Sequence, residues 1–199
     1  MVIVIGFGGE PATGKSRIMK DAMAALGEKP IVTDIRVDKH TIKLTMFTDN
    51  NVIVIGHYLP GEKFGGTDRL SMSVQPSVEQ YIKRLEKEKI SVWFEGDRLF
   101  NIKFIQYIMS LECFSFFFIV DARNDVKATR HAERDNQNES WLRGRATKVG
   151  NIKEEFDLPV VYNNIPSDIE TIVKFILQVN VNLLKKYTQN KRSKDELGY

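Results

Sequence analysis

The chain has 199 residues, of which 42% are hydrophobic and 28% charged, and its formal net charge is +3. This length fits one domain with a substantial core, and no apolar stretch reaches the roughly 18 residues that a membrane span needs. The single cysteine, Cys113, excludes an internal disulfide and agrees with a reducing compartment. Because the first residues form neither a basic segment nor a small-residue cleavage site, we expect a cytoplasmic protein without a signal peptide.

Short apolar runs alternate with segments of helical periodicity along most of the chain. The runs that predict strands cover residues 2–6, 30–33, 91–94, 114–120 and 158–162, and the predicted helices cover 16–26, 78–89, 102–111 and 168–187. This order indicates a three-layer α/β fold in which helices cover both faces of a mostly parallel sheet.

Two segments of alternating hydrophobicity interrupt this order at residues 41–57, around a polar turn at 49–51. The pattern predicts a β-hairpin, which we interpret as an insertion into the fold. We expect residues 1–187 to form a single domain and residues 188–199 to form a basic, flexible tail. The excess positive charge lies near this end, which indicates either a solvated terminus or weak attraction to nucleic acid.

Residues 9–16 have the pattern G-x-x-x-x-G-K-S, directly after the first predicted strand and before the first predicted helix. Glycines let backbone N–H groups approach phosphate oxygens, and the positive end of a helix attracts the same anion. In this pattern the lysine reaches the β- and γ-phosphates and the serine hydroxyl ligates Mg²⁺. The sequence therefore predicts a site for ATP and magnesium, formed by Gly9, Thr13, Gly14, Lys15 and Ser16.

Two carboxylates and an arginine follow the strand predicted at 91–94, as Glu95, Asp97 and Arg98. Ligands of open α/β sheets bind at the carboxyl ends of strands, and a kinase needs a carboxylate there for Mg²⁺ or its waters. We expect Glu95 or Asp97 to serve the metal and Arg98 to hold the acceptor or the ATP phosphates. A surface cluster of ion pairs is the alternative.

Asp34 and Arg36 lie near the end of the second predicted strand. One helix and one strand separate Asp34 from Lys15, which is enough chain to return to the same sheet edge. A carboxylate beside the γ-phosphate can orient and deprotonate an attacking hydroxyl, so we predict that Asp34 is the general base and that Arg36 binds the acceptor. A capping or turn role for Asp34 is the alternative.

A glycine-rich polar loop, Gly65-Gly66-Thr67-Asp68-Arg69-Leu70-Ser71, follows the predicted hairpin. Loops of this kind often close over acceptors, so we predict that Asp68 and Arg69 bind the substrate. Asp68 and Asp97 are rivals of Asp34 for the role of base. The alternative is a plain connecting loop.

Cationic residues gather in the polar segment 125–148, which we interpret as an arginine-rich lid; they are Arg130, Arg134, Arg143, Arg145 and Lys148. Arg130 and Arg134 are spaced i,i+4, so they repel unless an anion lies between them. Phosphoryl transfer needs such cations at the transferred group, and we predict catalytic roles for Arg130, Arg134 and Arg143 and contact of Arg145 with ATP. Gly144 would supply a hinge. A helix stabilised by internal ion pairs is the alternative.

Taken in order, these motifs resemble the nucleoside-monophosphate-kinase-like branch of the P-loop kinases. The resemblance implies that Asn163 and Asn164, after the last predicted strand, lie near the adenine base. The spacing from Lys15 to Asp34 resembles that of polynucleotide kinases, and Glu95-Gly96-x-Arg98 is similar to the zeta-toxin-type kinases.

Three segments, 65–71, 94–99 and 141–148, are more narrowly similar to phage P-loop kinases linked to the phosphorylation of 5-hydroxymethyluracil in DNA. This resemblance implies transfer of the γ-phosphoryl group of ATP to the 5-hydroxymethyl group of a modified pyrimidine in DNA. A C5 substituent projects into the major groove, where a hydroxyl can be reached with or without flipping the base. A deoxynucleoside monophosphate kinase, a nucleotide-dependent DNA-binding ATPase and a toxin-like kinase on a small sugar nucleotide remain open, and none of these implies a membrane partner.

Overall fold

The computed structural model of the chain describes residues 1–58, 65–132 and 138–180. Its strands form one seven-stranded sheet in the order β2-β3-β4-β5-β1-β6-β7. The strands are β1 (Val2–Gly8), β2 (Ile31–Val37), β3 (His40–Phe47), β4 (Val52–Ile55), β5 (Ser91–Glu95), β6 (Cys113–Asp121) and β7 (Val160–Tyr162). The mostly parallel sheet predicted from the sequence is confirmed, because only β3 runs against the other strands.

The predicted hairpin is present as β3 and β4, but it is not an insertion outside the sheet. β4 pairs in parallel with β5, and β2 pairs with the far side of β3. The hairpin therefore separates β2 from the centre of the sheet and makes it an edge strand. This placement decides the position of the polar residues on β2.

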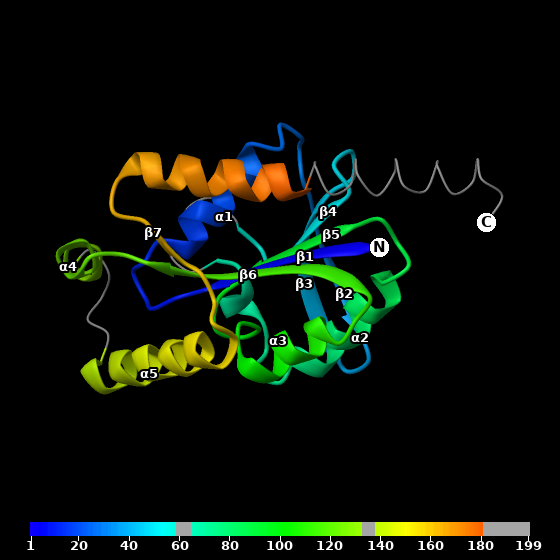
Figure 1. Cartoon of the computed structure of the whole chain (residues 1–199). Coiled ribbons are helices and arrows are strands. Elements are labelled where there is room, and N and C mark those ends of the chain that lie inside the picture. The colour runs from blue at the N-terminus through cyan, green and yellow to red at the C-terminus, as the bar shows by residue number, and fades with distance from the viewer. Residues whose placement is uncertain (59–64, 133–137, 181–199) are drawn as a thin grey trace.

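Helices cover both faces of the sheet, as Figure 1 shows. The labelled helices are α1 (Lys15–Ala24), α2 (Gln75–Leu85), α3 (Ile102–Met109), α4 (Asn124–Ala132) and α5 (Glu139–Phe156), with a 3-10 turn η1 (Thr67–Arg69). A further helical stretch covers residues 166–180. α1 and this stretch lie on one face, and α2, α3 and α5 lie on the other. No helix among these described residues is long and apolar enough to cross a membrane.

The alternation of side chains along β1 explains the three layers. Val2 and Val4 belong to the core against α2, α3 and α5, whereas Ile3 and Ile5 pack toward α1 and residues 166–180. Successive side chains of a strand point to opposite faces, so a strand that is apolar throughout must be covered on both sides. All residues of β1 are buried, which agrees with this position.

The centre of the sheet brings the predicted motifs together at one edge. β1 pairs in parallel with β5, with Phe7 opposite Glu95. The loop 9–16 and the segment that begins at Glu95 therefore leave neighbouring strands at the same carboxyl edge, where open α/β sheets bind ligands. Figure 1 shows that α4 and the start of α5 also lie toward this end of the sheet.

Element boundaries differ from the sequence-based ones mainly in the polar segment. Residue Gly144, predicted as a hinge, lies inside the continuous helix α5. Residues 133–137, including Arg134, and the predicted tail at 188–199 lie outside the described residues.

Candidate active site

The loop 9–16 joins β1 to α1 and has the backbone shape of an anion cradle. Gly14 is the N-cap of α1, with a φ of 93°, and no side chain caps the helix. The exposed N–H groups of such a helix start bind anions well. A side chain at Gly14 would also meet Asn163 Nδ2 at 2.1 Å, so both the turn and the close packing require glycine here.

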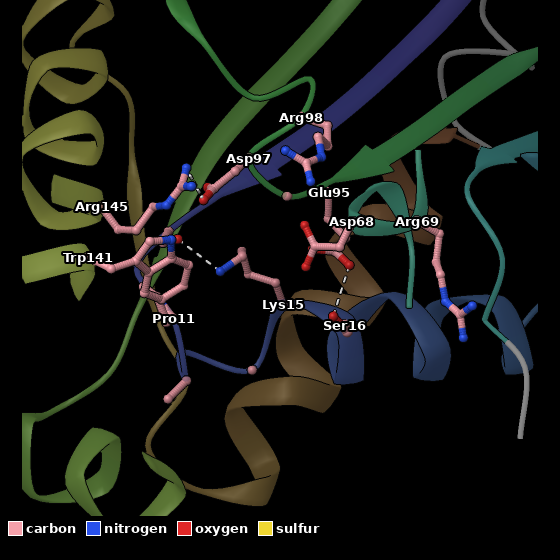
Figure 2. Close-up of a pocket in the computed structure, with 14 residues that line it drawn as sticks. Pro11, Lys15, Ser16, Asp68, Arg69, Glu95, Asp97, Arg98, Trp141 and Arg145 are labelled. Atoms are coloured by element: carbon pink, nitrogen blue, oxygen red, sulfur yellow. Dashed lines mark hydrogen bonds and ion pairs between the residues drawn. The ribbon is translucent and has the colours of Figure 1, made fainter. Parts of the chain in front are cut away.

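The Lys15 ammonium folds over this loop. Its Nζ donates to the carbonyl oxygens of Gly9 and Glu10, at 2.8 Å in each case. Lys15 and Ser16 line a pocket of about 550 Å³, shown in Figure 2. The remaining lining residues come from the loop, η1, the end of β5 and α5, and are Gly9, Pro11, Ala12, Gly14, Asp68, Arg69, Glu95, Gly96, Asp97, Arg98, Trp141 and Arg145.

Glu95 is the buried carboxylate of the site. Its Oε1 accepts hydrogen bonds from Ser16 Oγ at 2.9 Å and from Tyr58 Oη at 3.2 Å, and its carbonyl oxygen accepts from Thr67 Oγ1 at 2.6 Å. Burial raises the pKa of Glu95 to about 7; Lys15 and the two hydroxyl donors oppose that shift. The same burial, together with Glu95, raises the pKa of Tyr58 well above its ordinary value.

Gly66 lets the loop of η1 approach this carboxylate. It has a φ of 67°, and a Cβ there would lie 2.5 Å from Tyr58 Oη and 2.6 Å from Glu95 Oε1. Gly66 also forms an antiparallel bridge with His57. Gly66 is therefore a packing requirement that lets the turn carrying Asp68 lie close to Glu95.

The residues of the pocket fit a magnesium ion that is held mainly by a nucleotide. Ser16 Oγ and the Glu95 carboxylate offer adjacent oxygen ligands, and a buried carboxylate with a raised pKa gains most from a cation. Within residues 1–58, 65–132 and 138–180, no three His, Cys, Asp or Glu side chains form a metal cluster. One or two protein oxygens, completed by phosphates and waters, are the usual set for Mg²⁺ in kinases.

Asp68 and Asp97 face the pocket from two different segments. Asp68 is exposed, yet partial desolvation of its carboxylate and the nearby Asp97 raise its pKa, while Lys15, Arg98 and Arg145 act in the opposite direction. Asp97 forms an ion pair with Arg145, in which its Oδ2 lies 2.8 Å from Arg145 Nη1. Of the two, Asp68 is the carboxylate that is placed to take a proton.

The face of α5 that carries Trp141, Arg145 and Lys148 turns toward the end of β5. Arg145 lies over the Trp141 ring at 5.1 Å and pairs with Asp97, while Lys148 Nζ donates to the Asp97 carbonyl at 2.8 Å. Burial lowers the pKa of Lys148, and Arg145 and Arg98 act in the same direction. The segment predicted as a lid thus reaches the pocket through one helical face.

Two further arginines line the pocket, Arg98 from the segment after β5 and Arg69 from η1. Arg98 contacts Met72 Sδ through Nη1, and its Nε is buried without a hydrogen-bond partner among the described residues. Arg69 also lines the pocket, but Figure 2 shows its guanidinium pointing away from Lys15 and Asp68. Arg98 is therefore better placed than Arg69 to meet an anion inside the cavity.

Arg130 and Asn163 support the loop from behind and do not line the pocket. Arg130 donates to the carbonyl oxygens of Ala12, at 3.3 Å, and Asn163, at 3.0 Å, and Asn163 Nδ2 donates to Thr13 O at 2.8 Å. Asn163 is buried, so the structure places its side chain in the packing under the loop. Thr13 is buried too, with its hydroxyl bonded to Glu10 O at 2.9 Å.

Three residues predicted from the sequence lie away from the pocket. Asp34 pairs with Lys43 and His57, at 3.3 and 3.1 Å, and Arg36 is exposed and bonds to Asp38 O. Asp34 lies level with Glu95 along the sheet but three strands away, about 14 Å at the usual strand spacing. Arg143 is exposed on α5, two residues from Trp141 and Arg145 and therefore on another face of the helix. The structure therefore places Asp34 and Arg36 outside the pocket, because β3 and β4 lie between β2 and β5.

Sequence reasoning missed Tyr58, Thr67 and Trp141. Tyr58 and Thr67 contact Glu95, and Trp141 lines the pocket. Only Trp141 had a signal in the sequence, its i,i+4 spacing to Arg145 in a predicted lid.

A family model described as P-loop Nucleotide Kinase3 matches residues 2–177 of the chain. No curated protein matches. Similar solved structures include an uncharacterized protein from Eubacterium ventriosum, at 12% identity and a TM-score of 0.46, covering 89% of this chain and 98% of the other. They also include shikimate kinase from Bacteroides thetaiotaomicron (11%, 0.41, 90% and 98%) and deoxyadenosine kinase from M. mycoides with dCMP and dCDP (11%, 0.40, 90% and 99%). Similarities to solved structures at this level add nothing to the family match.

Proposed function

The chain belongs to the P-loop Nucleotide Kinase3 family. We propose that it transfers the γ-phosphoryl group of ATP to the 5-hydroxymethyl group of a modified pyrimidine in DNA. Family membership makes the chain a P-loop kinase, and hence a phosphotransferase. The residues of the pocket support the remaining parts of the proposal, which are the nucleotide as phosphoryl donor, the magnesium ion and the acceptor.

The contact between Ser16 and Glu95 is the observation that carries the proposal. It joins the anion cradle of the loop 9–16 to a buried carboxylate at the end of the neighbouring strand. This pairing supplies the two elements that phosphoryl transfer needs, a cradle for phosphates and oxygen ligands for Mg²⁺. When bound, the metal neutralises charge on the phosphates.

The place where three segments of the sequence meet supports the choice of a hydroxymethylated pyrimidine as the acceptor. The segments 65–71, 94–99 and 141–148, on which the resemblance to hydroxymethyluracil kinases rests, each contribute side chains to the pocket. They contribute Asp68, Arg98 and Arg145, for example, and all three line the cavity that also contains Lys15. A hydroxyl that enters this cavity meets both a base and the phosphate cradle.

We assign the general base to Asp68. The acceptor oxygen attacks the γ-phosphorus, the bond from that phosphorus to the β–γ bridging oxygen breaks, and ADP leaves. The hydroxyl proton passes to the Asp68 carboxylate, whose raised pKa makes it a stronger base than an ordinary aspartate. Lys15, Arg98 and Arg145 provide the positive charge that stabilises the transferred group.

A transfer assay with γ-labelled ATP tests the proposal. The acceptors are DNA containing 5-hydroxymethyluracil, the same DNA with thymine, the deoxynucleoside monophosphates, and buffer alone. We expect label on the hydroxymethylated DNA and none on the thymine control. Label on a monophosphate alone would contradict a DNA acceptor, and phosphate release without a labelled acceptor would favour a DNA-binding ATPase.

A deoxynucleoside monophosphate kinase is the second candidate, and Arg98 favours it. Its Nε is buried without a partner among the described residues, as expected for a side chain that binds the phosphate of a free nucleotide. Salt distinguishes the two acceptors, because affinity for DNA falls steeply with ionic strength. A KM that changes little between low and moderate salt would support the free nucleotide.

A further inference from the structure

Trp141 is an exposed aromatic ring in a pocket that is otherwise largely polar. It is 41% exposed and lines the same cavity as Lys15, Asp68 and Arg98. The only other tryptophan of the chain, Trp93, is fully buried and bonded to Ser91. An indole that stays exposed beside charged groups is a surface that a flat apolar ligand can cover.

The ring is held in place before any ligand arrives. The Arg145 guanidinium lies over it at 5.1 Å, and Arg145 is fixed in turn by Asp97 at 2.8 Å. Lys148, on the same face of α5, bonds to the Asp97 backbone. These contacts tie Trp141 to the end of β5, and a fixed ring loses little conformational entropy when a ligand stacks on it.

We propose that Trp141 is the stacking platform for the acceptor base, which enters the pocket as an unstacked pyrimidine. This inference rests on the proposed function and specifies how the acceptor is recognised. Enzymes that modify a base must take it out of the duplex or act on a single strand, and they read it by stacking on aromatic side chains. Figure 2 shows Trp141 and Lys15 at the same cavity, so a base stacked on this ring lies in the cavity that also contains the phosphate cradle.

The position of Trp141 favours the acceptor base over the base of ATP. Its contacts run through Arg145 to Asp97, which lies in the segment after β5 with Arg98. These residues line the same cavity as Asp68, the general base. A ring on this side stacks on the molecule whose hydroxyl meets Asp68.

The test uses Trp141→Leu in the full chain, with Trp141→Phe as the conservative variant. The probe is a single-stranded oligonucleotide with one 5-hydroxymethyluracil, titrated without ATP while tryptophan emission is followed. We expect saturable quenching in the natural protein and none in Trp141→Leu, because Trp93 is buried. In transfer assays the KM for the oligonucleotide should rise between about fivefold and a hundredfold in Trp141→Leu, and less in Trp141→Phe. The KM for ATP should stay the same.

Phe175→Leu is the matched control, since Phe175 is a half-exposed aromatic residue in the helical stretch 166–180, outside the pocket. It should leave both KM values unchanged. An unchanged KM for the oligonucleotide in Trp141→Leu would overturn the inference, as would quenching by Mg·ADP with a raised KM for ATP. If the natural protein labels no DNA, the proposed function fails. Quenching of Trp141 emission by the oligonucleotide would then still support base stacking. If the oligonucleotide does not quench this emission either, both the proposed function and the stacking role of Trp141 are overturned.

Discussion

The nucleotide side and the lid side of the pocket are built in different ways. β1 and β5 are buried along their whole lengths, and α1 buries Ile18, Met19, Ala22 and Met23. By contrast, α4 buries no residue and α5 buries only Ile152. The lid side is held to the rest of the site by polar contacts, such as Arg145 to Asp97 and Lys127 to Glu10. The phosphate cradle is therefore fixed by the core. By contrast, α4 and residues 139–148 of α5 bury no side chain, so they can exchange protein contacts for contacts with phosphates at little cost in apolar burial.

Lys15→Ala should break the cradle and have the largest effect. Removing the ammonium that contacts the loop should lower kcat about a thousandfold, in the range known for lost electrostatic groups. The measurement is transfer of label from γ-labelled ATP, with circular dichroism to show that the fold persists. Lys20→Ala removes the same charge from α1 outside the pocket and should retain activity. Comparable losses in both variants would contradict a specific role for Lys15.

Asp68→Asn should lower kcat about a hundredfold or more, as expected when a general base is lost, and Asp34→Asn should change it less than twofold. The two variants remove one charge each, so they distinguish the pocket carboxylate from the one at the sheet edge. The pKa of Asp68 is raised, and the base acts only when it is deprotonated. As the pH is lowered, activity should therefore begin to fall at a higher pH than an ordinary aspartate would give. A large loss in Asp34→Asn with normal turnover in Asp68→Asn would reverse the assignment.

Glu95→Gln should weaken the binding of magnesium and yet stabilise the nucleotide-free protein. The folded-state pKa of about 7 lies above the unfolded value of 4.5, so the folded protein holds a proton that the unfolded chain has lost between these values. Stability therefore falls as pH rises from about 4.5 to 7, by roughly 3 kcal/mol at most. Thermal unfolding should show a higher Tm for Glu95→Gln than for the natural protein at pH 8 and a similar Tm at pH 4. A lower Tm for Glu95→Gln than for the natural protein at pH 8 would show that the buried charge of Glu95 does not destabilise the fold.

Asn163→Ala should have the smallest effect, a loss of about 1 kcal/mol in the free energy of unfolding. It removes the hydrogen bond to Thr13 O that supports the loop from below. We expect a raised KM for ATP with little change in kcat, because Asn163 positions the loop and does not line the pocket. Urea unfolding and steady-state kinetics measure the two quantities. A collapse of kcat with unchanged affinity would argue for direct contact with the reacting groups.

The sequence was sufficient for the cradle and insufficient for the lateral order of the strands. The pattern at 9–16 and the acidic segment after β5 are local signals, and parallel pairing of β1 with β5 brings them together. Asp34 was predicted at the carboxyl edge of the sheet, and along the strand direction it does lie level with Glu95. No local signal in the sequence, however, shows that a hairpin separates β2 from β5. Tyr58 approaches Glu95 through a loop whose path depends on Gly66, and such a contact leaves no periodic pattern.

The central position of β1 has a consequence for the order of folding. β1 is synthesised before the other strands of the sheet, and both of its partners, β5 and β6, follow much later in the chain. β1 therefore cannot be paired on both of its sides until residues up to Asp121 have left the ribosome. A nascent chain that stops before β6 leaves one long side of β1 open, which makes such fragments prone to aggregate and to need chaperones.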